Sequence, residues 1–261
     1  MGILNVTPDS FADGGLHDAA ATSVARIAAI AAQGAAICDV GAESTRPGAS
    51  PVPVDDELHR LAPVLQAMRD GAVGVPISID TRHARTAEAA LDAGAVLVND
   101  VSAGADPAML PLVADRGAAV CLMHMRGEPA TMQDDPRYDD VVGEVVAFLE
   151  ARLEAAVAAG VREDDVLLDP GIGFGKALGH NLALMRALPR IAAIGRPVVV
   201  GASRKGFIGQ LTGREVVDRL PGSLGAAMAA VAGGASVVRV HDVAATVDAL
   251  AVFTAARGEE E

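Results

Sequence analysis

Eight times along the chain, a short run of apolar residues is followed by a longer, alanine-rich stretch with helical spacing. The apolar runs are continuous rather than alternating, as expected for parallel strands that are covered on both faces. Strands are predicted at residues 2–6, 36–40, 76–80, 96–100, 119–124, 166–169, 197–201 and 236–240. Helices are predicted at residues 19–33, 55–69, 84–93, 107–116, 140–159, 181–194, 222–232 and 243–256.

Eight such units in 261 residues predict an α/β protein of the (β/α)8 TIM barrel class, with one domain spanning residues 1–261. A doubly wound open sheet would show the same alternation, and the number of units favours the barrel. Four helical stretches end at a glycine, where positive φ commonly terminates a helix: Gly34, Gly94, Gly117 and Gly160. The acidic tail, residues 258–261, is expected to be solvated and frayed.

The composition narrows the classes of protein that this chain can be. It has no apolar run near membrane-spanning length and no targeting segment, so we expect a cytoplasmic protein. A net charge of -13 disfavours nucleic acid and anionic membranes as partners, because the field would repel polyanions. The two cysteines, Cys38 and Cys121, lie in predicted strands and are expected to be core residues rather than a disulfide or metal pair.

Polar side chains follow almost every predicted strand at its carboxyl end. In a (β/α)8 barrel these ends converge on one face, where the chemistry of such enzymes is located. One such residue alone could be a helix cap, but a ring of them indicates a functional site. The ring comprises Asn5, Asp39, Asp80, Asn99 with Asp100, His124, Asp169, residues 203–205, and Arg239 with His241.

The residue types in this ring indicate the kind of ligand. Asp80, Asn99 and Asp169 accept hydrogen bonds and suit a flat heterocycle that presents N–H donors. Asn5 could give an oxygen ligand to Mg²⁺. Only 2% of the residues are aromatic, so an arginine guanidinium could provide the stacking plane. Donors and cations suited to a phosphate or carboxylate are Thr45, Arg46, Arg239 and His241.

Two other site classes fit the sequence poorly. The segment DPGIGFGK, residues 169–176, lacks the P-loop pattern because Pro170 replaces the first glycine and Ala177 the hydroxyl residue. A barrel metal hydrolase needs a His-x-His pair at the first strand end, where this chain has Asn5-Val6-Thr7. The only lysines, Lys176 and Lys205, both lie in glycine-rich loops after strands, which indicates that a compact ammonium is needed there.

The chain resembles the dihydropteroate synthase family along its whole length. The segments that carry the resemblance, in order, are MGILNVTPDSFADGG, DVGAESTRPGA, SIDT, VNDVSAG, CLMHMRGEPATMQ, LLDPGIGFGK, GASRKGFIGQLTG and RVHDV. The resemblance implies a transferase that joins 6-hydroxymethyl-7,8-dihydropterin diphosphate to 4-aminobenzoate and releases pyrophosphate. The product, 7,8-dihydropteroate, serves folate and tetrahydrofolate biosynthesis, and sulfonamides would compete with 4-aminobenzoate.

The resemblance also implies roles for individual residues, with Mg²⁺ as cofactor and Asn5 as its protein ligand. The pterin pocket would comprise Asp39, Asp80, Asn99, Met123, Asp169, Lys205 and Arg239. The diphosphate would contact Asn5, Thr45, Arg46, Arg239 and His241. The 4-aminobenzoate would contact Phe11, Arg46, Pro47, Phe174, Ser203 and Lys205, with loops 9–15 and 44–50 closing over the mouth.

The implied mechanism is a Mg²⁺-assisted, dissociative loss of pyrophosphate before the amine attacks. The catalytic residues would be Asp80, Lys205, Arg239, His241 and Asp13. The resemblance further implies a homodimer formed through the late helices. About a dozen residues that precede MGILN in the family, and that close the other end of the barrel, are missing here, which predicts a truncated or wrongly assigned start.

Two further readings remain open at this point. A pterin-binding barrel without synthase activity, such as a diverged paralogue or a relative of the folate-dependent methyltransferases, would keep Asp80, Asn99 and Asp169. It would not need the diphosphate and 4-aminobenzoate loops, which this chain has. A non-enzymatic scaffold would leave the ring of polar strand ends unexplained.

Overall fold

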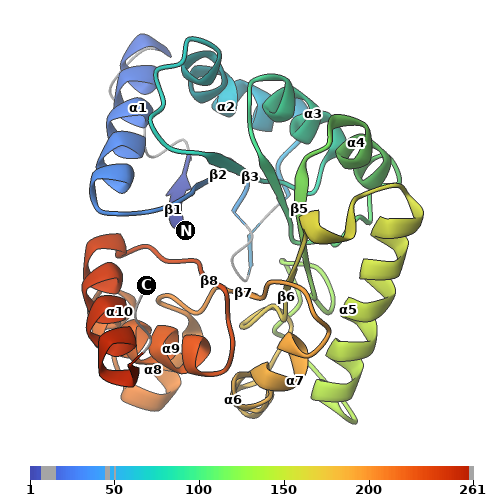
Figure 1. Ribbon diagram of the computed structural model, residues 1–261, viewed down its shortest axis with the longest axis vertical. Coiled ribbons are helices and arrows are strands. Elements are labelled where there is room, and N and C mark those ends of the chain that lie inside the picture. The colour runs from blue at the N-terminus through green and yellow to red at the C-terminus, as the bar shows by residue number, and fades with distance from the viewer. Residues whose placement is uncertain (7–15, 45–47, 50, 259–261) are drawn as a thin grey trace.

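A ring of parallel strands surrounded by helices forms the molecule (Figure 1). The computed structural model describes residues 1–6, 16–44, 48–49 and 51–258. The strands are β1 (Gly2–Asn5), β2 (Cys38–Gly41), β3 (Ile77–Asp80), β4 (Leu97–Asp100), β5 (Ala119–Met123), β6 (Val166–Asp169), β7 (Val199–Val200) and β8 (Val237–Val238). The helices are α1 (Leu16–Ala32), α2 (Val54–Arg69), α3 (Ala84–Asp92), α4 (Met109–Arg116), α5 (Val141–Ala158), α6 (Leu178–Arg186), α7 (Leu188–Ala192), α8 (Gly206–Thr212), α9 (Leu220–Ala232) and α10 (Val243–Arg257).

The strands close into a barrel. Strands β1 to β6 pair in sequence order as one parallel sheet, and β7 pairs with β8 in a second. Single bridges join the two pieces at both edges, Gly2 to Val240 and Leu168 to Val198. The amide of Ile3 donates to the carbonyl of Val240 at 3.0 Å, so β1 follows directly on β8. The predicted eight-stranded α/β barrel is therefore confirmed.

The predicted elements are all observed in the predicted order, but β7 and β8 have two residues each where five were predicted, and two further differences concern helices. The predicted helix 181–194 is divided into α6 and α7, because Pro189 lacks the amide that a continuous helix would need. Helix α8 was not predicted, because its seven residues contain two glycines and are too few for a clear helical period. The four predicted terminal glycines all have positive φ, between 59° and 102°.

The two faces of each strand pack against different layers. Residues such as Val40, Ile79, Val98 and Leu168 are buried against the helices in the main core. The alternate residues point into the barrel, where Leu97, Cys121 and Val199 form a separate cluster. Both described cysteines are buried free thiols, as predicted. Because side chains alternate with period two, the polar residue two positions beyond an inward apolar residue also faces the barrel axis.

No helix within the described residues combines the length and apolar character needed to cross a lipid bilayer. Asp140 precedes helix α5 and caps it, because its carboxylate accepts a hydrogen bond from the Gly143 amide at 3.0 Å. The helices surround the ring, and α10 lies next to α1 where the circuit closes (Figure 1). Because the paired strands are parallel, the loops that follow them lie at the same end of the barrel.

Candidate functional site

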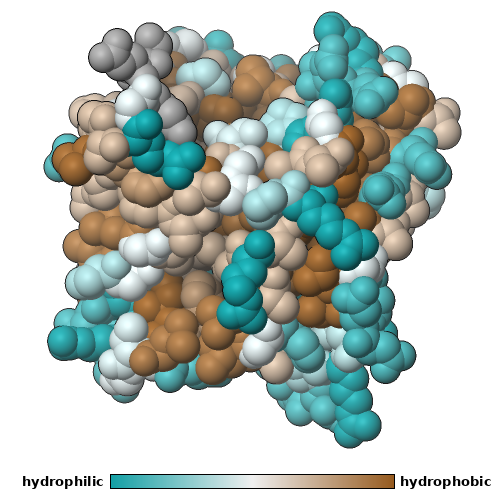
Figure 2. All heavy atoms as spheres, turned by 60° about the horizontal axis from the view of Figure 1, so that its bottom comes forward, coloured by the Kyte–Doolittle hydropathy of each residue, from teal (hydrophilic) through white to brown (hydrophobic). Residues whose placement is uncertain are grey.

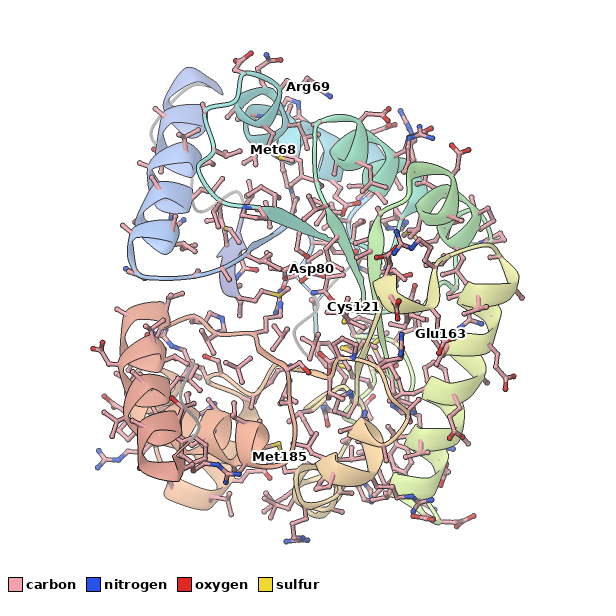
Figure 3. The ribbon with its side chains drawn as sticks, in the orientation of Figure 1. Met68, Arg69, Asp80, Cys121, Glu163 and Met185 are labelled. Carbon is pink, nitrogen blue, oxygen red and sulfur yellow. The ribbon has the colours of Figure 1, made fainter. Side chains whose placement is uncertain are left out.

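The centre of the barrel mouth holds an arginine between two carboxylates. Arg239, one residue beyond β8, donates from Nε to Oδ2 of Asp39 and from Nη2 to Oδ2 of Asp80, each at 2.6 Å. Figure 3 shows Asp80 at the middle of the ring of strands, whereas Arg69 and Met185 lie among the outer helices. The aspartates are nearly inaccessible to solvent, so the ion pairs are only weakly screened by water.

Asp39 is also held by its neighbours on β3 and β4. Ser78 donates to Asp39 Oδ1 at 2.6 Å, and the side-chain amide of Asn99 donates to Oδ2 at 3.1 Å. Asp39 lies opposite Ser78, and Asp80 lies opposite Asn99, in the paired strands. The Asp39 carboxylate thus lies one layer deeper in the barrel than the Asp80 carboxylate, and its hydrogen bonds fix the orientation of Asn99.

A glycine makes room for this arrangement. Gly41 on β2 lies opposite Asp80, and a Cβ atom at Gly41 would lie 3.1 Å from the Asp80 Cβ. A side chain at this position would require Asp80 to move by a few tenths of an ångström. This spacing explains why β2 ends in the small residue of the DVG sequence rather than in another polar side chain.

Burial changes the proton affinity of these groups. Loss of solvent raises the pKa of Asp80 to about 7, against the opposing effect of Arg239 and with a further increase from Asp39. Burial would lower the pKa of Arg239, but the two carboxylates outweigh it and raise that pKa. Arg239 therefore stays charged, whereas Asp80 can gain or lose its proton near neutral pH.

Asp169, at the end of β6, forms the next part of the mouth. Its Oδ1 accepts a hydrogen bond from the Gly171 amide at 2.7 Å, which turns the chain sharply into the following loop. Burial raises the pKa of Asp169, while the Gly171 amide and the ammonium of Lys205 oppose the change. Asp169 thus lies close to two cationic groups, Lys205 and Arg239.

The loop after β6 presents an aromatic ring to Lys205. The Nζ atom of Lys205 lies 3.8 Å from the centre of the Phe174 ring, which is cation–π geometry. Phe174 is buried although it lies in a loop. Phe174 and Lys205 line one hollow together with Asp80 and Asp169. The full lining is Asp80, Asn99, Val101, Met123, Asp169, Ile172, Phe174, Gly201, Lys205 and Arg239.

The turns after β7 and β8 are joined to each other. Arg204 has φ of 59°, a strained conformation for a residue with a side chain, and its guanidinium donates from Nε to Asp242 at 3.0 Å. Beside this ion pair, the amide of His241 donates to Ser203 Oγ at 3.2 Å, and His241 Nδ1 lies 3.1 Å from the same hydroxyl. Ser203 and His241 are therefore fixed relative to each other.

The structure brings together most of the predicted site residues. Asp80, Asn99, Met123, Asp169, Phe174, Lys205 and Arg239 line one hollow. Asp39 lies directly beneath it, bonded to Arg239. Asn5 ends β1, in register with Gly41, and Ser203 and His241 contact each other as described. Phe11, Asp13, Thr45, Arg46 and Pro47, and most of the predicted closing loops 9–15 and 44–50, lie outside the described residues.

Sequence reasoning missed one residue with a clear role. Ser78 orients Asp39, and the period of two could have found it, because Ser78 precedes Asp80 by two residues on the same strand face. The described residues contain no cluster of three or more His, Cys, Asp or Glu side chains that could hold a metal ion. A metal here would depend on other oxygen ligands.

The family follows from a comparison of the whole chain with known proteins. A family model described as "Pterin binding enzyme" matches residues 1–241. The chain belongs to this family. The match spans every strand of the barrel, including β1 with Asn5 and the β8 end with Arg239 and His241.

Individual members of the pterin-binding family are similar over almost their full length. The dihydropteroate synthase of Neisseria meningitidis serogroup B is 48% identical, covering 98% of this chain and 91% of that protein. The Xanthomonas albilineans dihydropteroate synthase solved with 4-aminobenzoic acid has a TM-score of 0.91 and 48% identity, over 98% of this chain and 92% of the other. The structure of the Xanthomonas albilineans enzyme in complex with 7,8-dihydropteroate has a TM-score of 0.88 and 45% identity, again over 98% of this chain and 92% of the other.

Proposed function

We propose that this chain is a dihydropteroate synthase, a transferase that condenses 6-hydroxymethyl-7,8-dihydropterin diphosphate with 4-aminobenzoate to give 7,8-dihydropteroate and pyrophosphate. The observation that carries the proposal is the single hollow in which Asp80, Asn99 and Asp169 face Arg239 and Lys205. The similarity to dihydropteroate synthases over 98% of the chain, including one solved with the product, supports it.

The acceptor side of the hollow binds the pterin. The ring edge of a pterin presents several N–H donors, and Asp80, Asn99 and Asp169 place carboxylate and amide oxygens along one wall. Met123 supplies an apolar contact from β5. Arg239 provides the guanidinium plane for stacking, and the pterin N–H groups then replace part of its hydrogen bonding to the aspartates.

The opposite side binds the arylamine. Phe174 and Lys205 form a flat apolar and cationic surface, and Ser203 lies one turn away, next to His241. A cavity of about 470 Å³ adjoins the hollow, and Lys205 lines both, while Gly173 and Lys176 lie in the cavity wall. This cavity gives 4-aminobenzoate a route to the reacting carbon, with Phe11, Arg46 and Pro47 completing its site.

The diphosphate is bound between the strand ends of β1 and β8. Arg239 and His241 supply cationic or donor groups, Asn5 supplies an oxygen, and Thr45 and Arg46 complete the set. Mg²⁺ fits this donor set, because it keeps several waters and commonly binds substrate phosphates with one or two protein oxygens. When bound, Mg²⁺ supplies positive charge to the leaving diphosphate, and Asn5 is the side chain that holds it.

The chain's own charges favour breaking the carbon–oxygen bond first. The electron pair of that bond leaves with the diphosphate oxygen, which Arg239 and His241 stabilise. The resulting cation is spread over the dihydropterin ring and is stabilised by Asp80, Asp169 and Asp13. The amine nitrogen, oriented by Lys205 and Phe174, then forms the new carbon–nitrogen bond and loses one proton.

A two-substrate assay of pyrophosphate release tests the proposal. Pyrophosphate is expected only when the pterin diphosphate, 4-aminobenzoate and Mg²⁺ are all present, with dihydropteroate formed in equal amount and sulfonamides competing against 4-aminobenzoate. A protein that binds the pterin but releases no pyrophosphate with 4-aminobenzoate would be a non-synthase barrel. Full activity in the presence of a chelator would remove Mg²⁺ from the proposal.

We also propose a homodimer through the late helices. Val252 on α10 and Val217 between α8 and α9 are 72% and 78% exposed, and Figure 2 shows apolar surface over this side of the molecule. Light scattering is expected to give twice the monomer mass for the wild type and a lower mass for Val252→Glu.

We also propose a cytoplasmic location, which the two buried free thiols support.

A further inference from the structure

A buried lysine, Lys176, lies in the wall of the 470 Å³ cavity and is not among the substrate contacts proposed above. Lys176 is only 2% exposed. Its Nζ atom lies 2.9 Å from Nδ1 of His124, 3.2 Å from the His124 carbonyl and 3.0 Å from the Phe174 carbonyl. These three acceptors match the three protons of an ammonium group.

His124 connects this lysine to the end of the barrel. Its amide donates to the Asp169 carbonyl at 2.9 Å, so the residue is fixed where β5 and β6 end. Its ring packs edge-on against Phe148 of α5, with ring centres 4.9 Å apart. Burial and the neighbouring Lys176 lower the pKa of His124 to about 3, so the ring is neutral and its Nδ1 can accept from the lysine.

Lys176 therefore joins the loop of Phe174 to a rigid strand end. The Phe174 carbonyl receives one Lys176 hydrogen bond, while the Phe174 ring faces the Lys205 ammonium. The neighbouring Gly173 has its own hydrogen bonds, because its amide donates to Asn181 at 2.7 Å and its carbonyl accepts from Gln133 at 2.7 Å. The Lys176 contacts join the loop to the end of β5 through His124.

Burying a lysine costs desolvation free energy, which a residue that serves only for packing would not require. Burial lowers the pKa of Lys176 to about 7, although the charge of Asp169 opposes this, and the positive charge of Lys205 adds to it. A methionine would fill similar space without this penalty. What a methionine cannot do is donate to the two loop and strand carbonyls at the same time.

We infer that Lys176 is a positioning residue for the arylamine substrate. By fixing the Phe174 backbone against His124, it sets the position of the aromatic ring that packs on Lys205. This inference rests on the proposed function, which places 4-aminobenzoate against Phe174 and Lys205. It assigns to Lys176 a larger effect on the binding of 4-aminobenzoate than on that of the pterin diphosphate, although the charge of Lys176 also acts on Asp169 in the pterin pocket.

The test compares Lys176→Met with the wild-type enzyme in steady-state kinetics with both substrates. The KM for 4-aminobenzoate is expected to rise by about tenfold or more, because small misplacements of a contact surface carry penalties of this size. The KM for the pterin diphosphate should change by less than about twofold. Equal changes in both values, or no change in either, would overturn the inference.

A matched control separates positioning from general loss of stability. Thr86 donates to the buried Glu57 carboxylate at 2.7 Å between α3 and α2, on the helix side of the barrel. Thr86→Val removes one buried hydrogen bond, against three for Lys176→Met, and it should lower the melting temperature while leaving both KM values unchanged. A rise in the KM for 4-aminobenzoate in this control as well would count against a specific role for Lys176.

A second pair of variants keeps the inference testable should Lys176→Met fail to fold. His124→Asn retains a side-chain acceptor close to the position of Nδ1, whereas His124→Leu does not. Only His124→Leu is expected to raise the KM for 4-aminobenzoate, and identical kinetics for the two variants would overturn the inference. A wild-type enzyme that makes no dihydropteroate would instead refute the proposed function itself.

Discussion

Arg239 and Asp80 are 159 residues apart in the chain, yet Nη2 of one lies 2.6 Å from Oδ2 of the other. The pair crosses the barrel mouth from the end of β8 to the end of β3, and Asp39 on β2 bonds to the same guanidinium. A positive group and two negative groups thus lie within hydrogen-bonding distance of each other at the proposed substrate site. A diphosphate and the cation it leaves behind need that combination.

Asp80→Asn is expected to reduce turnover by several tens-fold or more while the fold is retained. Each charged contact of this kind contributes about 2 to 4 kcal/mol to stabilising the transition state. Single-turnover kinetics and circular dichroism would measure the two effects separately. The exposed Asp55, which pairs with Arg85 at 2.7 Å on the surface, supplies the control variant Asp55→Asn. Unchanged turnover in Asp80→Asn would remove Asp80 from the mechanism.

The pH dependence of kcat/KM should have an acid limb near pH 7. The pKa of Asp80 is raised to about 7 by burial, so below that pH the carboxyl is protonated and no longer supplies negative charge to the pterin cation. Activity is therefore expected to fall as the pH falls through about 7. The profile of Asp80→Asn, measured in the same buffers, should lack this limb; a limb of equal size in both proteins would assign it to another group.

His124 predicts a loss of stability in acid. The pKa of this ring is lowered from 6.5 to about 3, first by burial and then by Lys176, so the unfolded chain binds more protons in the interval between these values. The free energy of unfolding should fall as the pH falls from about 6.5 toward 3, by at most about 1.4 kcal/mol per pH unit from this residue. Urea unfolding of His124→Asn should show a smaller slope than the wild type, and equal slopes would contradict the assignment.

Two glycines with positive φ are predicted to differ in their tolerance of alanine. At Gly171, φ is 68° and an added Cβ would collide with the His124 carbonyl. At Gly94, φ is 102° and no atom lies within 4 Å of such a Cβ. Gly94→Ala should cost about 1 to 2 kcal/mol of backbone strain, and Gly171→Ala more, with loss of activity. Thermal unfolding of both variants checks this, and equal losses would show that the collision is relieved.

The position of the polar residues at the strand ends could be predicted from local sequence pattern. Asp80, Asn99 and Asp169 follow short apolar runs, and the topology of a parallel barrel is enough to place all three at one mouth. The structure bears out this placement, because all three line one hollow. Their roles toward a pterin remain predictions.

Other features of the site could be identified only from distances between side chains in the structure. Local sequence pattern did not distinguish Lys176 from Lys205, since both lie in glycine-rich loops after strands, and only the family resemblance gave Lys205 a role. In the structure Lys205 faces the hollow and Lys176 is buried against His124. Likewise, no role was predicted for Ser78 from the sequence, although its hydroxyl donates to Asp39 Oδ1 at 2.6 Å.

The amino-acid sequence by itself determined the number of β/α units, the end of the barrel that carries polar groups, and the residues available there. These follow from hydrophobic period and chain order, which act over a few residues at a time. Only the tertiary structure decided that Arg239 pairs with Asp39 and Asp80 and that Lys176 holds the Phe174 loop. Such contacts depend on how the closed barrel staggers its strands and on which buried groups must find partners, and both are settled when distant segments pack together.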